Sequence, residues 1–168
     1  MSSENDTQRK NTVTRVHKPL VFLDADVIFA GAAAPTEHGA SHVLLRMGEI
    51  TLLECVTSEQ AITEVERNLI AKIPTKLLEF RLLVSHCLRV VPDPAVDDLR
   101  LYIGQADPKD LPLLVAALQA NCPYLITFNT RRYFPAAKSI TIQRPGEFLL
   151  TVRTLLSQMS LSSEVLGE

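Results

Sequence analysis

Two aspartates follow a short apolar run near the start of the chain. Asp24 and Asp26 come directly after residues 20–23, LVFL. A continuous apolar run is typical of a parallel strand buried on both faces, and ligands bind beyond the carboxyl ends of such strands. Carboxylates in this place can bind a divalent cation, attack a phosphate or transfer protons, although either aspartate could instead cap the following turn. The sequence therefore predicts chemistry at Asp24, with Asp26 in a supporting role.

The next candidate carboxylates lie on a helix that the sequence predicts over residues 59–72. Ser58 directly precedes this helix and suits its N-cap position. Glu64 and Glu66 are the two candidates. On a helical wheel Glu66 lies closer to the apolar stripe, so the wheel favours Glu66 over Glu64 as the inward-facing residue. For either glutamate, a place on the solvated face of the helix is the alternative interpretation.

A third group of acids lies in the segment ADPKD, before an apolar helix predicted over residues 111–120. Asp107 precedes a proline and suits an N-cap, and Asp110 occupies the acidic place of a capping box. The helical wheel also puts Asp110 at the centre of the apolar face. A carboxylate there needs a partner, because burying an unpaired charge is costly, and a metal ion is such a partner. We therefore expect Asp110 to be functional and Asp107 to be mainly a cap.

Polar residues also follow a strand predicted over residues 124–128. Asn129 can offer an oxygen to a metal ion or orient a water, or it can be an ordinary turn residue. Thr127 lies near the carboxyl end of this strand. Cationic side chains flank the expected crevice and could contact phosphate groups, or they could be solvated turn charges. These cations are Lys109, Arg131 and Arg132.

The elements that must position these residues alternate along the chain. Strands are predicted over residues 20–23, 50–56, 88–91, 124–128 and 139–142. Helices are predicted over 40–47, 59–72, 75–87, 95–104, 111–120 and 145–158, and a small-residue loop over 31–39. This alternation predicts an α/β fold of three layers, α/β/α, in which helices cover both faces of a central parallel sheet of four or five strands.

The ends of the chain differ from the region between them. Residues 1–18 are polar and mixed in charge, and are predicted to be a disordered N-terminal extension. Residues 19–158 are expected to form one domain, and 159–168 a flexible C-terminal tail. The chain length of 168 residues is sufficient for a single buried core.

Composition excludes several classes of protein. The net charge of −2 argues against binding nucleic acid by global electrostatics, but it allows a nuclease that contacts a few phosphates locally. The cysteines, Cys55, Cys87 and Cys122, have neither a zinc-site nor a disulfide-framework spacing, which favours a reducing compartment. No signal peptide is recognisable and no apolar run is long enough to cross a bilayer. The sequence therefore predicts a soluble cytoplasmic protein with no membrane partner.

Four segments in this order resemble those of the PIN-domain ribonucleases, which include the VapC-type toxins. The segments are LDADV, SEQAITEVERNL, DPKDLPLLVAAL and TFNTRRYFP, and IQRPGEFL resembles the closing strand and helix of the family. The resemblance covers residues 20–150. It implies the same three-layer fold for the domain at 19–158, a site for Mg²⁺ or Mn²⁺, and hydrolysis of RNA. Its register selects Glu64 rather than Glu66.

The resemblance also implies roles for the individual residues. Asp24, Glu64 and Asp110 would hold the metal ion, which polarises the scissile phosphate and lowers the pKa of an attacking water. Asn129 would complete the catalytic set, although many members of the family have an aspartate at its position. Supporting positions would be Asp26, Asp107 and Thr127, and RNA-binding positions Lys109, Arg131 and Arg132. RNA is the implied substrate, and an antitoxin protein and a second copy of the chain are candidate partners.

Two alternatives remain open from the sequence. A catalytically degenerate PIN-like module would bind RNA or a protein without cutting, and Asn129 together with the near-neutral charge keeps this alternative open. The segment DADV also resembles the first motif of haloacid-dehalogenase-type phosphatases, in which Asp24 would be the nucleophile, Asp26 the general acid and base, and Thr127 a later motif residue. No acidic pair follows a later strand to complete that second pattern.

Overall fold

The computed structural model of the chain describes residues 18–33 and 39–164. Five strands form one sheet in the order β3-β2-β1-β4-β5, and every neighbouring pair is parallel. The strands are β1 (Leu20–Leu23), β2 (Glu54–Ser58), β3 (Leu88–Val91), β4 (Tyr124–Ile126) and β5 (Thr141–Gln143). The predicted parallel sheet is therefore confirmed.

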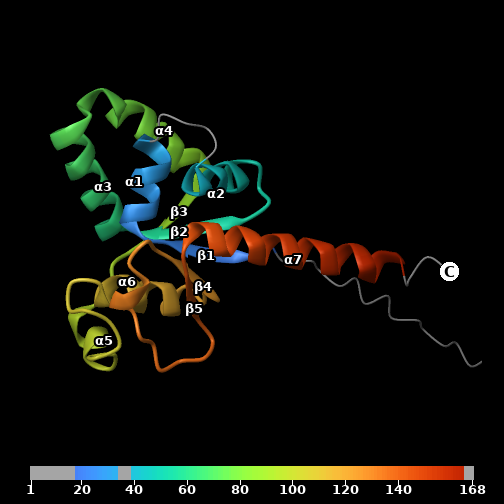
Figure 1. The fold of residues 1–168 in the computed structure, drawn as a ribbon. Helices are drawn as coiled ribbons and strands as arrows, with labels where there is room; N and C mark the ends of the chain where they lie inside the picture. The colour runs from blue at the N-terminus through green and yellow to red at the C-terminus, as the bar shows by residue number, and fades with distance from the viewer. Residues whose placement is uncertain (1–17, 34–38, 165–168) are drawn as a thin grey trace, which may run out of the picture.

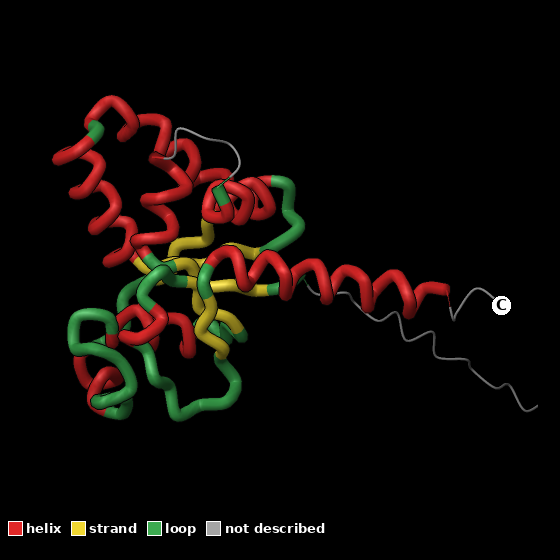
Figure 2. Tube along the Cα trace, in the orientation of Figure 1, coloured by secondary structure: helices red, strands yellow, loops and turns green. Residues whose placement is uncertain are grey.

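Helices cover both faces of this sheet (Figure 1). The helices α1 (Ala25–Ala33), α2 (Ala40–Glu49), α3 (Glu59–Lys72) and α4 (Leu77–Cys87) lie on one side, and α5 (Val96–Arg100) and α6 (Leu111–Gln119) on the other. Figure 2 shows the same three layers by secondary structure. Two short 3₁₀ helices, η1 (Pro74–Lys76) and η2 (Thr130–Arg132), join larger elements. The predicted α/β/α architecture is confirmed.

The last helix, α7 (Pro145–Glu164), packs by its first turns and then extends away from the sheet (Figure 1). Phe148 is fully buried, and its ring lies 5.1 Å from that of Tyr124 in β4, measured between centroids. The helix is longer than the prediction, which ended it at residue 158. The predicted disordered extension at 1–18 lies outside the described residues except for Lys18, and the flexible tail at 159–168 stays a prediction.

Strand β1 lies at the centre of the sheet because its residues can be buried on both faces. Val21, Phe22 and Leu23 have no exposed surface. The chain adds β2 and β3 on one side of β1 and then returns to add β4 and β5 on the other. The carboxyl ends of β1 and β4 therefore meet at the topological switch point, where α/β sheets bind ligands. The backbone N–H of Asp24 continues this pairing by donating to the carbonyl of Ile126 at 2.9 Å.

Helix α1 is the largest difference from the predicted elements. It begins directly after Asp24, whose carbonyl accepts hydrogen bonds from the N–H groups of Val27 and Ile28. Its sequence, ADVIFAGAA, is apolar on nearly all sides, and periodicity cannot distinguish such a buried helix from a strand or loop. The predicted loop at 31–39 is wrong for 31–33, which are helical; residues 34–38 lie outside the described part.

Boundaries of several other elements differ, among them the strand predicted over 124–128, which ends at Ile126, and the strand predicted over 139–142, which lies at Thr141–Gln143. Strand β2 begins at Glu54 rather than at residue 50, because residues 50–53 form the turn that follows α2. The helix predicted over 95–104 is limited to Val96–Arg100, and turns follow it up to Gly104, whose φ of +87° favours glycine. The predicted N-cap of α3 is confirmed, because Ser58 Oγ accepts from the N–H of Ala61 at 3.3 Å.

Helices α1 and α2 approach each other closely at Gly31. A Cβ atom added there would lie 2.5 Å from Leu45 Cδ1 and 3.0 Å from the carbonyl oxygen of Ser41. The carbonyl belongs to the backbone of α2, so relief requires movement of a whole helix. The close packing of these two helices therefore depends on the missing side chain at Gly31.

We expect Gly31→Ala to lower the free energy of unfolding by about 1–3 kcal/mol, the usual cost of overpacking a core. Gly146→Ala is the matched control, because a Cβ at Gly146 meets nothing within 4 Å and alanine favours a helix. Urea unfolding followed by circular dichroism measures both variants. Equal midpoints for Gly31→Ala and wild type would show that α1 and α2 can separate without cost.

Candidate functional site

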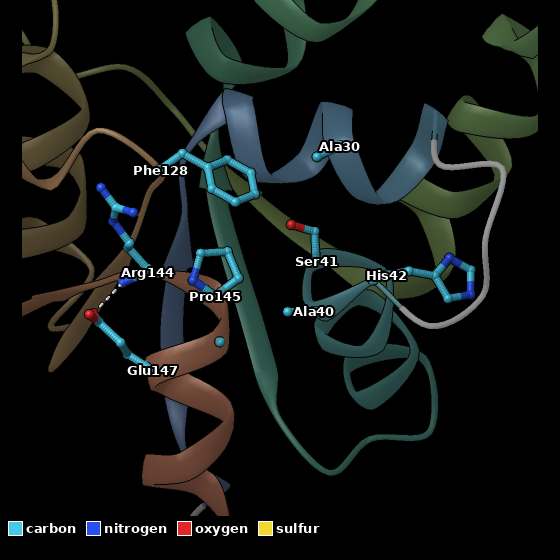
Figure 3. A pocket seen from close by; sticks show the side chains of 10 residues that line it. Ala30, Ala40, Ser41, His42, Phe128, Arg144, Pro145 and Glu147 are labelled. Carbon is cyan, nitrogen blue, oxygen red and sulfur yellow. Dashed lines mark hydrogen bonds between the residues drawn. The ribbon is translucent and has the colours of Figure 1, made fainter.

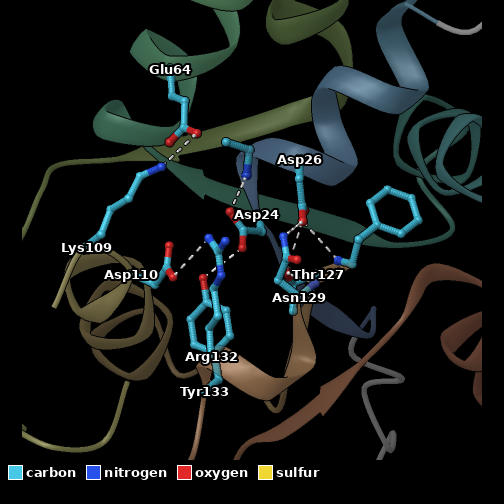
Figure 4. A network of polar contacts seen from close by, with 11 residues as sticks. Asp24, Asp26, Glu64, Lys109, Asp110, Thr127, Asn129, Arg132 and Tyr133 are labelled. Carbon is cyan, nitrogen blue, oxygen red and sulfur yellow. Dashed lines mark hydrogen bonds and ion pairs between the residues drawn. The ribbon is translucent and has the colours of Figure 1, made fainter. Parts of the chain in front are cut away.

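Asp24 lies at the carboxyl end of β1 and is only 7% exposed (Figure 4). Its Oδ2 accepts a hydrogen bond from the hydroxyl of Tyr133 at 2.7 Å, and its Oδ1 accepts from the N–H of Ala25 at 2.6 Å. Burial raises the pKa of Asp24, and these hydrogen bonds offset part of that effect. The carboxylate is thus held in a defined position in an environment that disfavours its charge.

Asp26 lies in the first turn of α1 and connects this helix to the loop after β4. Its Oδ2 accepts from Thr127 Oγ1 at 3.3 Å, from the N–H of Phe128 at 3.1 Å and from Asn129 Nδ2 at 2.9 Å. Burial, and secondly the charge of Asp24, raise the pKa of Asp26 to about 6. Its Oδ1 is buried without a hydrogen-bond partner. Asp26 therefore anchors the loop after β4 through Oδ2, while its Oδ1 accepts no hydrogen bond.

Asp110 is the N-cap residue of α6 and is 7% exposed, in agreement with its predicted place on the apolar face. Its Oδ2 is buried and has no hydrogen-bond partner, and Arg132 Nη1 lies 3.6 Å from the same oxygen. Burial, followed by the charge of Asp24, raises the pKa of Asp110. Asp24 and Asp110 therefore share one region of unfavourable negative charge.

The two glutamates of α3 face different neighbours. Glu66 Oε1 accepts from Arg81 Nε of α4 at 2.8 Å, and this contact lowers the pKa of Glu66. Glu64 Oε1 instead lies 3.9 Å from Lys109 Nζ, and the charge of Glu64 contributes to the raised pKa of Asp24. The structure thus places Glu64, rather than Glu66, near Asp24 (Figure 4). Glu66, which the helical wheel favours, is the less exposed of the two glutamates, 27% against 35%, but it pairs with α4 rather than facing Asp24.

Asp107 contributes through its backbone. Its carbonyl accepts from the N–H groups of Asp110 and Leu111, each at 2.9 Å, and its side chain is exposed. No side-chain hydrogen bond caps α6, so the predicted capping by the Asp107 carboxylate is wrong. The N–H of Asp107 donates to the carbonyl of Arg132 at 2.8 Å, next to an isolated antiparallel bridge between Ala106 and Tyr133. This pairing joins the loop before α6 to the loop after β4.

The remaining predicted residues lie on that second loop. Thr127 is fully buried, and its Oγ1 accepts from the N–H of Asn129 at 3.0 Å while it donates to Asp26. The side-chain amide nitrogen of Asn129 also donates a hydrogen bond to Asp26 Oδ2. Arg132 and Lys109 pair with acids of the site at long distances, and Arg131 is exposed. Two of the three predicted cations, Lys109 and Arg132, therefore lie beside the acids.

Tyr133 is a member of the site that the sequence interpretation did not identify. It is 5% exposed, and its hydroxyl reaches Asp24. Burial, and then the charge of Asp24, raise the pKa of this tyrosine, so its hydroxyl stays protonated and remains a donor. The signal was weak, since Tyr133 follows two arginines in a polar loop. An aromatic residue with a polar tip, four residues after Asn129, was the only indication.

The site can be tested for its fit to a divalent cation. Among the described residues, no three His, Cys, Asp or Glu side chains lie close enough together to hold a metal ion in their present positions. The donor chemistry nevertheless fits, because hard cations prefer carboxylate oxygens and both Asp110 Oδ2 and Asp26 Oδ1 are buried without hydrogen-bond donors. Ligation by Glu64 would require its side chain to leave Lys109.

The fold and these contacts define an α/β protein with a carboxylate-rich site at the switch point of its sheet. The sequence profile of the PIN domain matches residues 20–131, more than half of the chain. The chain therefore belongs to the PIN-domain family, whose members are generally nucleases that depend on divalent metal ions.

A solved structure with the same fold is the crystal structure of VapBC2 from Rickettsia felis bound to a DNA fragment from their promoter. The TM-score is 0.55 and the identity 12%, and the match covers 74% of this chain and 98% of the other. This likeness concerns the fold. A comparison with curated protein sequences finds no match. Within the described residues, no helix has the length and apolarity needed to cross a membrane.

We expect Asp110→Asn to raise the stability of the metal-free protein by about 1 kcal/mol, or about 2–4 °C in Tm, because it removes a buried charge close to Asp24. Mn²⁺ should raise the Tm of wild type and have less effect on the variant. Differential scanning calorimetry in EDTA and in Mn²⁺ measures both effects. Asp97→Asn is the control, since the Asp97 side chain is 86% exposed. A lower Tm of Asp110→Asn in EDTA would show that the pair with Arg132 outweighs the cost of burial.

Proposed function

We propose that this protein is a ribonuclease that depends on Mg²⁺ or Mn²⁺ and hydrolyses phosphodiester bonds in RNA. The observation that carries the proposal is that Asp110 Oδ2 is buried without a hydrogen bond, with only a long 3.6 Å ion pair to Arg132, in the same region as the buried carboxylate of Asp24. Two carboxylates in such a place are unfavourable without a positive partner. Membership of the PIN-domain family supports a nuclease site as the explanation for these two buried carboxylates.

Asp24, Glu64 and Asp110 would hold the ion. When bound, a divalent ion supplies positive charge to the scissile phosphate and lowers the pKa of a water. Tyr133 fixes the Asp24 carboxylate by its hydroxyl, which restricts the direction of the acceptor oxygens. Asp26 uses Oδ2 to anchor the loop after β4. Because the Asn129 amide nitrogen donates to Asp26, any contribution of Asn129 to an ion or water would come from its amide oxygen.

Cations beside the acids would contact the RNA strand. Lys109 and Arg132 have side chains that are 70% and 46% exposed, and their partners Glu64 and Asp110 lie 3.9 Å and 3.6 Å away. Such long, partly exposed ion pairs are weak. Lys109 and Arg132 could therefore exchange these acids for phosphate oxygens at small cost, and Arg131 is exposed on the same loop.

A role as the toxin of a toxin–antitoxin pair is a further part of the proposal. It is supported by the shared fold with the VapBC2 structure, in which a VapBC complex is bound to DNA. An antitoxin protein would then be a partner in the cytoplasm, and a second copy of this chain could form a homodimer. The metal-dependent cleavage of RNA can be tested without either partner.

The phosphatase alternative has less support. It requires Asp24 to be free to attack phosphorus and Asp26 to transfer a proton. Asp26, which would transfer that proton, instead accepts three hydrogen bonds on Oδ2 that anchor the loop after β4. The alternative of a binding-only module predicts the same fold and the same contacts, and differs from the nuclease only in activity.

We expect wild-type protein to cleave single-stranded RNA with Mn²⁺ and not with EDTA. Asp24→Asn and Glu64→Gln should each lower the cleavage rate at least about 100-fold, because each removes a ligand charge. Glu66→Gln is the matched control on the same helix and should keep the wild-type rate, since Glu66 pairs with Arg81. Rates are measured with an end-labelled oligoribonucleotide.

The same experiment separates the alternatives. A wild-type protein without Mn²⁺-dependent cleavage would contradict the nuclease and favour the binding-only module. Phosphate release from a monoester substrate would favour the phosphatase. Equal loss of activity in Glu66→Gln and Glu64→Gln would contradict the assignment of Glu64.

We also expect Tyr133→Phe to raise the half-saturating Mn²⁺ concentration about 10-fold, because Asp24 loses the donor that orients it. The maximal rate at saturating Mn²⁺ should recover to near the wild-type value. Tyr102→Phe is the control, since Tyr102 is only partly buried against the core and its hydroxyl reaches no acid of the site. A Mn²⁺ dependence identical to wild type would show that Tyr133 only fills space.

A further inference from the structure

We propose that a cavity beside the acidic site binds one unstacked nucleotide of the RNA strand. This inference rests on the proposed function and names the form of its substrate. The cavity has a volume of about 410 Å³ and lies between the first turns of α2 and α7 (Figure 3). Its size is within the range of small-ligand pockets. The aromatic side chain of Phe128 forms one wall.

Phe128 gives the cavity an aromatic surface. Phe128 is 42% exposed. Figure 3 shows its ring facing the cavity opposite Ala40 and Pro145. The lining is mainly apolar around this ring, including Ala30 and Ala40. Aromatic side chains on a protein surface stack with single-stranded bases, and this stacking is tolerant of base identity. The wall thus suits the face of a nucleobase.

The opposite side of the cavity can receive a phosphate. The first turn of α2 lines it, and no side chain caps this helix at Gly39. Ser41 is 6% exposed, and its hydroxyl has no hydrogen-bond partner although it points into the cavity (Figure 3). A helix N-terminus attracts anions through its free N–H groups and its dipole. The buried, unpartnered hydroxyl is a separate indication that a polar ligand belongs here.

Arg144 adds a positive charge at the rim. It is exposed and directly precedes α7, whose first turn also lines the cavity. The nearby acid is Glu147, and its carboxylate accepts from the backbone N–H of Arg144 at 2.9 Å. Glu147 is therefore engaged as a helix cap, while the Arg144 guanidinium is available for a phosphate oxygen.

The position of the cavity connects it to the acids. The backbone N–H of Phe128 donates to Asp26, so the aromatic wall and the carboxylate cluster share one short loop. A strand with its phosphate at the acids could place the next base on Phe128. A duplex keeps its bases stacked and paired, so only a single-stranded or unpaired nucleotide can enter. The cavity therefore favours single-stranded RNA as substrate.

The first test uses the full chain in EDTA, where RNA cannot be cleaved by a metal-dependent site. Adenosine 5′-monophosphate is titrated while the amide signals of Ser41 and Gly146 are followed by nuclear magnetic resonance. We expect both signals to shift, and inorganic phosphate to bind about 10-fold more weakly because it lacks the base. Equal affinity for phosphate alone, or shifts that avoid these residues, would overturn the proposal.

The second test measures the affinity for a single-stranded oligoribonucleotide by fluorescence anisotropy in EDTA. Phe128→Ala should weaken binding on the order of 10- to 100-fold, the effect of losing one stacked base. Phe134→Ala is the matched control, because Phe134 is 51% exposed and does not line the cavity. Arg144→Gln should weaken RNA binding several-fold. Because the Arg144 side chain is exposed, this variant should fold and can test the cavity even if Phe128→Ala does not fold.

The outcomes separate the cavity from the nuclease. Nucleotide binding in the cavity without Mn²⁺-dependent cleavage would contradict the proposed nuclease and leave the cavity assignment in place. Metal-dependent cleavage with wild-type RNA affinity in both variants would overturn the cavity assignment alone. Equal affinity for duplex and single-stranded RNA would also overturn it, as would an adenosine monophosphate titration without shifts.

Discussion

The burial of Asp24 at the end of β1 is the constraint on which the site depends. A carboxylate that is 7% exposed is unfavourable when charged, and Asp110 brings a second one into the same region. The surrounding contacts reduce this cost without removing it. Tyr133 donates to Asp24, and Arg132 lies near Asp110 at a distance too long for a strong pair. Like charges concentrated in this way are relieved either by protonation of one group or by a counter-ion, and a divalent metal ion would be such a counter-ion.

The fold brings these acids together through its switch point. Asp24 follows β1, and the loop after the adjacent strand β4 carries Asn129 and Tyr133. Asp110 comes from the opposite layer, where backbone hydrogen bonds between residues 105–107 and 132–134 fix the loop before α6. The site is thus assembled from both helical layers and the sheet, and no single element contains it.

Much of this arrangement could be predicted from local patterns, and the exceptions have physical reasons. The apolar run of β1, the N-cap at Ser58 and the apolar face bearing Asp110 depend on residues close in sequence, and the structure agrees with each. Helix α1 was missed because it is apolar on almost every side. The choice between Glu64 and Glu66 depends on Arg81 from another helix, and Tyr133 on a hydrogen bond spanning 109 residues. Such long-range contacts leave no periodic signal.

The amide at Asn129 has a physical explanation in this chain. Asp26 Oδ2 accepts hydrogen bonds from a hydroxyl, a backbone N–H and the Asn129 amide nitrogen. An ionised aspartate at 129 has no proton to donate and would set a second carboxylate against Asp26, whose pKa is already raised to about 6. Asparagine keeps the connection between α1 and the loop after β4 while still offering an oxygen. Asparagine at 129 therefore fits the local charge balance beside Asp26.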